Sequence, residues 1–117
     1  MTEIGLTLRL LLPEGAVFGP GKARLLELIR SEGSISAAGR RMDMSYKRAW
    51  SLVEQMNESF AAPLVASVRG GAKGGGAQVT AFGEDVLALY RALEAEVLAS
   101  EATAAFGARL RVMSGEK

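Results

Sequence analysis

The first apolar residues of the chain fall at every second position. From Ile4 to Leu12 each even position is isoleucine or leucine, and Thr7 and Arg9 lie between them. A period of two is the side-chain repeat of a β-strand, because successive side chains point to opposite faces. We therefore predict a strand over 4–12 that ends at the turn-forming sequence Pro-Glu-Gly.

From residue 18 the apolar spacing changes to three or four, which is typical of a helix with one buried face. Leu25, Leu28 and Ile29 form the apolar stripe of this helix. Pro20 suits its first turn, where a missing N–H costs no hydrogen bond. Gly33 suits its end, where a left-handed residue is common. The pattern predicts one helix between these two positions.

Two further helices are expected with a very short connection. Residues 36–42 are mostly small, and Ser45 is a good N-cap for the longer helix that follows. Only Asp43 and Met44 remain between the two helices, so the turn is tight, and aspartate tolerates the left-handed backbone that such a turn needs. Because a helix of small residues allows close packing, we predict a helix-turn-helix over about 34–59.

The longer helix has one apolar side and one polar side. At about 100° per residue, Ala49, Val53 and Met56 fall together and are expected in the core. The first turn of the helix carries polar and aromatic side chains at an exposed N-terminus. In a DNA-binding helix-turn-helix this turn contacts base edges and phosphates. The candidate DNA contacts of the segment are Arg40, Arg41, Ser45, Tyr46, Lys47, Arg48, Trp50 and Ser51.

These candidates have different expected roles. We expect Lys47 and Arg48 to contact DNA directly, whereas Arg40 and Arg41 on the preceding helix suit phosphates better than bases. Two alternatives are open for Trp50. It packs against the following hairpin, which we favour, or it touches a thymine methyl group or a sugar.

A glycine-rich stretch, GGAKGGG, separates two strand-like runs, LVASVR and AQVT. A Walker A loop is excluded because Lys73 is followed by glycine rather than by the Ser or Thr that would bind magnesium. A flexible linker is disfavoured because the chain beyond it offers essentially one helix. We therefore predict a hairpin over 64–80, and a hairpin that follows a helix-turn-helix is called a wing. Arg69 and Lys73 are its candidate phosphate contacts.

A long last helix is predicted over about 81–106, with Thr80 as its N-cap. Its apolar residues recur every three or four positions and form a stripe longer than one small domain can cover. Because monomers rarely expose such a stripe, we predict a dimerisation helix. The alternative is that the N-terminal strand and the first helix cover the stripe within one chain. The candidate dimer contacts are Val86, Leu89, Tyr90, Leu93 and Val97.

The composition excludes many classes of enzyme. The 117 residues contain no cysteine and no histidine, which excludes disulfides, zinc fingers, thiol nucleophiles, histidine-based triads and histidine-ligated metals. We therefore expect no enzyme activity, no catalytic residue, no metal and no cofactor. Neither a secretory signal nor a membrane span is recognisable, so we expect a cytoplasmic protein without a membrane partner.

Positive charge is concentrated in the middle of the chain, although the net charge is only +1. Residues 39–77 hold six basic and three acidic side chains, whereas residues 78–106 hold one basic and five acidic ones. This division indicates that only the middle of the chain faces a polyanion such as DNA. The alternative is a winged-helix module that binds a protein and whose basic face is incidental.

The order of several motifs adds a family resemblance. GSISAAGRRMDMSYKRAW, VEQMNESF, PLV, GGAKGGGAQVT and FG follow one another along the chain. In this order they resemble the N-terminal DNA-binding domain of the ModE family of molybdate-responsive transcription regulators, from about Leu6 to Leu93. The resemblance implies an α+β fold, mainly helical with a small β component: a winged helix-turn-helix related to the LysR-type DNA-binding domain. It also implies a homodimeric transcription regulator that binds double-stranded DNA, with residues 1–117 as a single domain.

Three features depart from the family pattern. Asp43 stands where such turns usually carry glycine. Gly39 replaces a usual alanine, which costs the short helix up to about 1 kcal/mol of helix propensity. The chain also ends at Lys117 without a SARN-like oxyanion motif. The resemblance therefore implies the DNA-binding half without its sensor, and a separate molybdate-sensing partner stays open.

Overall fold

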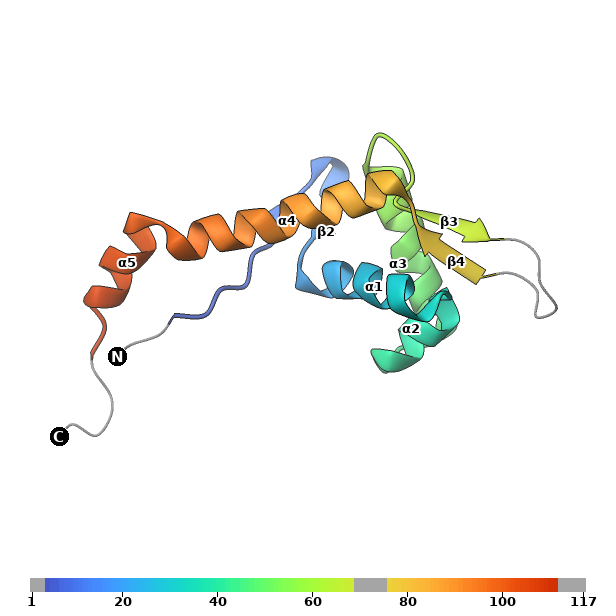
Figure 1. The fold of residues 1–117 in the computed structure, drawn as a ribbon, viewed down its shortest axis with the longest axis horizontal. Coiled ribbons are helices and arrows are strands. Elements are labelled where there is room, and N and C mark those ends of the chain that lie inside the picture. The colour runs from blue at the N-terminus through green and yellow to red at the C-terminus, as the bar shows by residue number, and fades with distance from the viewer. Residues whose placement is uncertain (1–3, 69–75, 112–117) are drawn as a thin grey trace.

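The computed structural model describes residues 4–68 and 76–111 and has the mainly helical α+β fold that the sequence predicts. Two small antiparallel sheets accompany five α-helices in this part of the chain (Figure 1). The elements in chain order are β1 (Leu10–Leu11), the 3-10 turn η1 (Pro13–Gly15), β2 (Val17–Phe18), α1 (Pro20–Glu32), α2 (Ile35–Arg41), α3 (Tyr46–Ser59), β3 (Val65–Val68), β4 (Gly76–Val79), α4 (Ala81–Ala99) and α5 (Glu101–Ala108).

Side-chain oxygens cap the N-termini of α2, α3 and α4. The hydroxyl oxygens of Ser34, Ser45 and Thr80 each accept a hydrogen bond from the backbone N–H three residues later, over 2.9–3.1 Å. These bonds satisfy N–H groups that have no partner inside a helix. The caps predicted at Ser45 and Thr80 are confirmed. Gly33 ends α1 in the left-handed conformation, with φ 75°, as its position predicts.

The turn between α2 and α3 is as tight as the sequence indicates. Asp43 has φ 58°, so the left-handed conformation expected of it is confirmed. Gly39 has a structural reason that the propensity argument missed: a Cβ atom there would lie 2.9 Å from the Cβ of Ala49. The missing side chain therefore lets α2 and α3 approach closely.

The hydrophobic core surrounds α1. Leu25 and Ile29 of this helix are completely buried. Phe18 of β2 packs edge-on against Phe60 and Tyr90, with ring centroids 5.9 and 5.1 Å apart. Such edge-to-face pairs add to the burial of apolar surface, so they fix the N-terminal segment and α4 onto the same core.

The β3–β4 hairpin occupies the predicted place of the wing. Its strands pair in antiparallel register from Val65 opposite Val79 to Val68 opposite Gly76. The backbone N–H of Ala77 donates to the carbonyl oxygen of Gly33 over 3.0 Å, which attaches β4 to the end of α1. The wing is thereby held against the helical body at its base.

The strand predicted over 4–12 is mostly absent. Only Leu10–Leu11 pair with another strand, β2. The alternation has another cause: Leu6 and Leu8 are half-buried whereas Thr7 and Arg9 are exposed. One-sided burial of an extended segment gives the same period of two as a strand, although no neighbouring strand completes a ladder.

The single last helix predicted over 81–106 is wrong as well, because the structure has two helices there. Ser100 is extended, with ψ 154°, and its hydroxyl oxygen accepts from the N–H of Thr103, so it begins a new helix. α5 runs to Ala108 and includes Gly107, which was expected to end the helix. In Figure 1, α4 leaves the body formed by α1, α2 and α3, and α5 follows at its far end beside the N-terminal segment.

Candidate nucleic-acid interface

α3 separates its residues into two faces, as its pattern predicts. Ala49, Val53 and Met56 are buried against the core. Tyr46 is 56% exposed, and Lys47, Arg48 and Ser51 are exposed beside it. The hydroxyl of Ser45, the N-cap, is next to this surface because it holds the N–H of Arg48. We call the exposed residues Ser45–Arg48, Trp50 and Ser51 the α3 surface.

Two arginines on α2 add positive charge. Arg40 donates to the hydroxyl oxygen of Ser36 over 2.9 Å, and Arg41 forms an ion pair with Glu32 over 2.6 Å. Both arginines are exposed. Because exposed ion pairs contribute at most about 1 kcal/mol, Arg41 can exchange Glu32 for another anion at small cost.

Two of the candidate DNA contacts belong to the wing. Arg69 and Lys73, its candidate phosphate contacts, lie outside the described residues. Trp50 is 46% exposed, so a large part of its indole ring is accessible. Neither of its two expected contacts, with the wing or with DNA, is tested by this exposure.

Asn57 was not singled out by sequence reasoning, yet it fixes the wing to α3. Its side-chain oxygen accepts from the N–H groups of Leu64 and Val65 over 2.8 and 3.2 Å, and its amide donates to the Val65 carbonyl over 3.1 Å. The side chain thus satisfies backbone groups at the start of β3 that would otherwise need a neighbouring strand. No local pattern indicates this role, because the contact joins two elements.

The predicted dimer contacts divide into two groups. Leu89, Leu93 and Val97 are 58%, 40% and 37% exposed on α4. Val86 is half-buried and packs against the core. Tyr90 does not belong to the exposed stripe: it is 2% exposed, and its hydroxyl donates to the backbone oxygen of Leu8 over 2.7 Å. The N-terminal segment therefore covers part of α4 within the chain, as the alternative expected, but leaves the rest uncovered.

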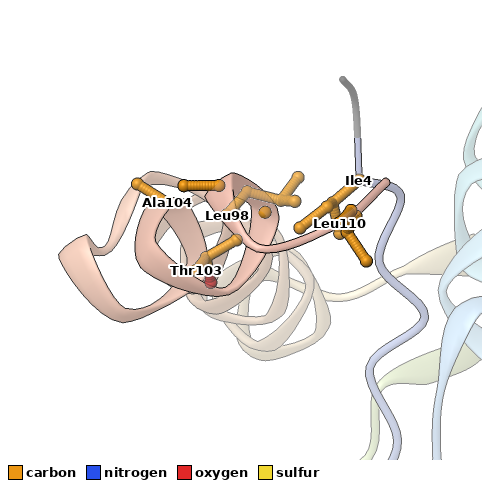
Figure 2. A pocket seen from close by; sticks show the side chains of 7 residues that line it. Ile4, Leu98, Thr103, Ala104 and Leu110 are labelled. Atoms are coloured by element: carbon orange, nitrogen blue, oxygen red, sulfur yellow. The ribbon is translucent and has the colours of Figure 1, made fainter. Parts of the chain in front are cut away.

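Two pockets lie beside α4, and the first of them adjoins the uncovered stripe. One of about 300 Å³ lies between β1, β2 and α4 and is lined by Leu10, Phe82 and Leu93, among others. Another of about 530 Å³ lies between the N-terminal segment and α5, where Figure 2 shows Ile4 and Leu110 facing Leu98. Among the described residues, no charged side chain lines the second pocket.

Ion pairs attach α4 to α1 at two places. Arg91 binds both carboxylate oxygens of Glu27, over 3.0 and 3.1 Å, and also Glu94 over 2.8 Å. Arg30 binds Glu84 over 2.7 Å. The hydrogen bonds from Glu27 and Glu94 raise the pKa of Arg91 above its ordinary value, so the guanidinium stays charged. These contacts hold the long helix in a fixed direction relative to the body.

Residues 4–68 and 76–111 hold no cluster of three or more acidic side chains that could bind a metal ion. No helix in these ranges is long and apolar enough to cross a membrane.

No family model matches the sequence. Curated relatives do match it. The molybdenum transport protein ModE of Azotobacter vinelandii is 45% identical over 82 residues, which are 70% of this chain and 30% of the relative. The transcriptional regulator ModE of Haemophilus influenzae is 40% identical over 93 residues, 80% of this chain and 36% of the relative. The DNA-binding transcriptional dual regulator ModE of Escherichia coli K12 is 38% identical over 88 residues, which are 75% of this chain and 33% of the relative.

The chain spans about a third of the length of the curated relatives it matches. Within that third, the identity of 38–45% extends over most of the 117 residues. This agrees with the resemblance carried by the motifs of α2, α3 and the wing. Over the segment that it shares with these relatives, the chain belongs to the ModE family.

Proposed function

We propose that this protein is a sequence-specific regulator of transcription that binds double-stranded DNA with the α3 surface in the major groove. The observation that carries the proposal is the division of α3 into two faces. Its core side is buried, whereas Lys47 and Arg48 are exposed at its N-terminus. Neither takes part in an ion pair among the described residues, so both charges are available to a polyanion.

The neighbouring groups support the same partner. Arg40 and Arg41 would hold phosphates on the α2 side, where their present partners are a serine and an exposed carboxylate. Arg69 and Lys73 would do so from the wing. Lys47 and Arg48 would contact base edges or nearby phosphates. Affinities measured on different DNA sequences distinguish the two, because loss of a base contact reduces sequence preference whereas loss of a phosphate contact weakens binding to all sequences alike. That two of the relatives are named transcriptional regulators supports this proposal.

We also propose that the protein acts as a homodimer through Leu89, Leu93 and Val97. These residues leave an apolar stripe uncovered on α4, and monomers rarely expose one. A second copy would bury the stripe and place two α3 surfaces on one side by two-fold symmetry, about 34 Å apart if the half-sites are one turn apart. Residues 1–117 would form one domain of this dimer.

The DNA contact is tested by titrating a duplex with the variant Lys47→Ala, Arg48→Ala. A lost base contact costs about 1–3 kcal/mol, so we expect binding to weaken at least about fivefold. The matched control is Arg24→Ala, Arg109→Ala, which removes the same charge from exposed positions on α1 and directly after α5. Full-strength binding by the α3 variant would refute the assignment. A wild-type protein that binds no DNA at low salt would favour the protein-binding module instead.

The dimer is tested by light scattering at micromolar concentration. We expect a wild-type mass of two chains and a mass of one chain for Leu93→Glu, which places a charge in the stripe. The control is Ala95→Glu, an exposed position on the opposite side of α4. A single-chain mass for the wild type would refute the dimer.

A further inference from the structure

A pocket of about 280 Å³ adjoins the α3 surface, and the DNA contacts proposed above do not use it. It lies between the N-terminal segment, the start of α1, the α2–α3 turn and the first two turns of α3. In the described part of the chain, its charged lining residues are Arg9, Lys22 and Arg48, from three separate segments, and no acidic residue lines it. The pocket is therefore positive, and through Arg48 it is continuous with the α3 surface.

Lys22 is held in place by neutral partners. Its ammonium donates to the backbone oxygen of Val17 over 2.5 Å and to the side-chain oxygen of Gln55. An ammonium group has three N–H donors, so one remains for a ligand. Because both partners are uncharged, the positive charge is not neutralised, and burial lowers the pKa of Lys22 below its ordinary value. An anion in the pocket would remove this cost.

Arg9 stands at the entrance from the N-terminal segment. It is exposed and takes part in none of the ion pairs of the described residues. Its stem lies against the start of α1, where a Cβ atom at Gly19 would come within 3.2 Å of the Arg9 Cγ. The glycine thus allows the Arg9 stem to pack against the start of α1, at one wall of the pocket.

Acidic side chains line the neighbouring pocket that Gln55 adjoins. Glu14 and Glu58 line a neighbouring pocket of about 320 Å³ that shares Gln55 with the contacts of Lys22. The positive surface is therefore bounded on that side. A polyanion that lies along α3 meets attraction as far as Lys22 and repulsion beyond it.

We propose that the pocket between Arg9, Lys22 and Arg48 binds one phosphate group of the DNA backbone, next to the groove that the α3 surface contacts. The inference rests on the proposed function and extends it, because it gives the N-terminal segment and α1 a part in DNA binding. Arginine supplies paired N–H donors for the phosphate oxygens, and lysine supplies a point charge. Such a contact increases the affinity for all sequences alike.

The test compares Arg9→Gln with the wild type in titrations of a duplex at several salt concentrations. We expect the affinity to fall roughly three- to tenfold on every sequence. The slope of log K against log salt should become less negative by about 0.9, which is the contribution of one phosphate contact to that slope. Arg109→Gln is the matched control, since it removes the same charge from the exposed end of α5 and should change neither quantity. Thermal unfolding should show that Arg9→Gln leaves the fold intact.

The outcomes separate the two proposals. If the wild type binds DNA and Arg9→Gln equals it in affinity and slope, the phosphate pocket is refuted while the α3 contact stands. If the wild type binds no DNA, the proposed function fails. A third arm titrates inorganic phosphate and follows the amide resonances of Gly21 and Lys22. Submillimolar phosphate binding that Arg9→Gln abolishes, with unchanged DNA affinity, would identify a site for a free anion and overturn the inference.

Discussion

Replacing Gly83 by alanine should detach the start of α4 from the wing. A Cβ atom at this position would overlap the carbonyl oxygen of Leu64 and lie 2.8 Å from Cγ1 of Val79. The same carbonyl accepts from the N–H of Thr80 over 2.9 Å. Since a backbone oxygen cannot turn aside as a flexible side chain can, the first turn of α4 has to move.

The magnitude follows from three opposing effects. Overpacking costs roughly 1–3 kcal/mol, and weakening the bond between Thr80 and Leu64 costs about 1 kcal/mol more. Alanine recovers about 1 kcal/mol of helix propensity relative to glycine. We expect the free energy of unfolding to fall by about 2 kcal/mol for Gly83→Ala, which corresponds to a melting temperature lower by roughly 10 °C.

Urea denaturation of the variant measures this loss. The control is Gly21→Ala, which makes the same change in the first turn of α1, where nothing lies within 4 Å of the added Cβ. That substitution should leave stability unchanged or raise it by up to about 1 kcal/mol. Equal stabilities for the two variants would show that the close contact at Gly83 relaxes freely, contrary to the reasoning.

Two further substitutions test long-range contacts of the fold. Tyr90→Phe removes the hydrogen bond to Leu8 and should cost about 1 kcal/mol. Because burial and Glu94 raise the pKa of Tyr90 above 10.0, the tyrosine stabilises the fold fully below that pH and progressively less above it. The stability difference between wild type and Tyr90→Phe should therefore shrink as pH rises past 10, and a constant difference in denaturation experiments would contradict this. Asn57→Ala leaves the N–H groups of Leu64 and Val65 unpaired and should cost about 2 kcal/mol. Hydrogen exchange at these two amides should accelerate, and unchanged protection would refute the role of Asn57.

Features set by neighbouring residues could be predicted from the sequence. The caps at Ser45 and Thr80, the left-handed residues Gly33 and Asp43, and the buried face of α3 depend on spacing or on one backbone position. The same holds for the α3 surface, because one buried face of a helix fixes the exposed one.

Features set by distant contacts could not be predicted. The alternation from Ile4 to Leu12 indicates one-sided burial but does not say whether a strand or a helix provides it. Tyr90 fits the apolar stripe by spacing, yet its hydroxyl finds a partner 82 residues away. From the sequence alone Lys22 is an ordinary surface lysine, because its hydrogen bonds to Val17 and Gln55 depend on the fold.

The two ion-pair attachments of α4 have a geometric consequence for the proposed dimer. Glu84 and Arg91 are seven residues apart, about 10 Å along the helix axis. From Glu84 to the end of α4 at Ala99 the helix runs about 22 Å, so a movement of 1 Å at Arg91 becomes a sideways displacement of roughly 2 Å at the far end of the helix. That displacement is more than half of the axial rise of one base pair, about 3.4 Å. In the proposed dimer α4 would therefore act as a lever arm, and the stiffness of its two salt bridges to α1 would affect which half-site spacing the pair of chains accepts.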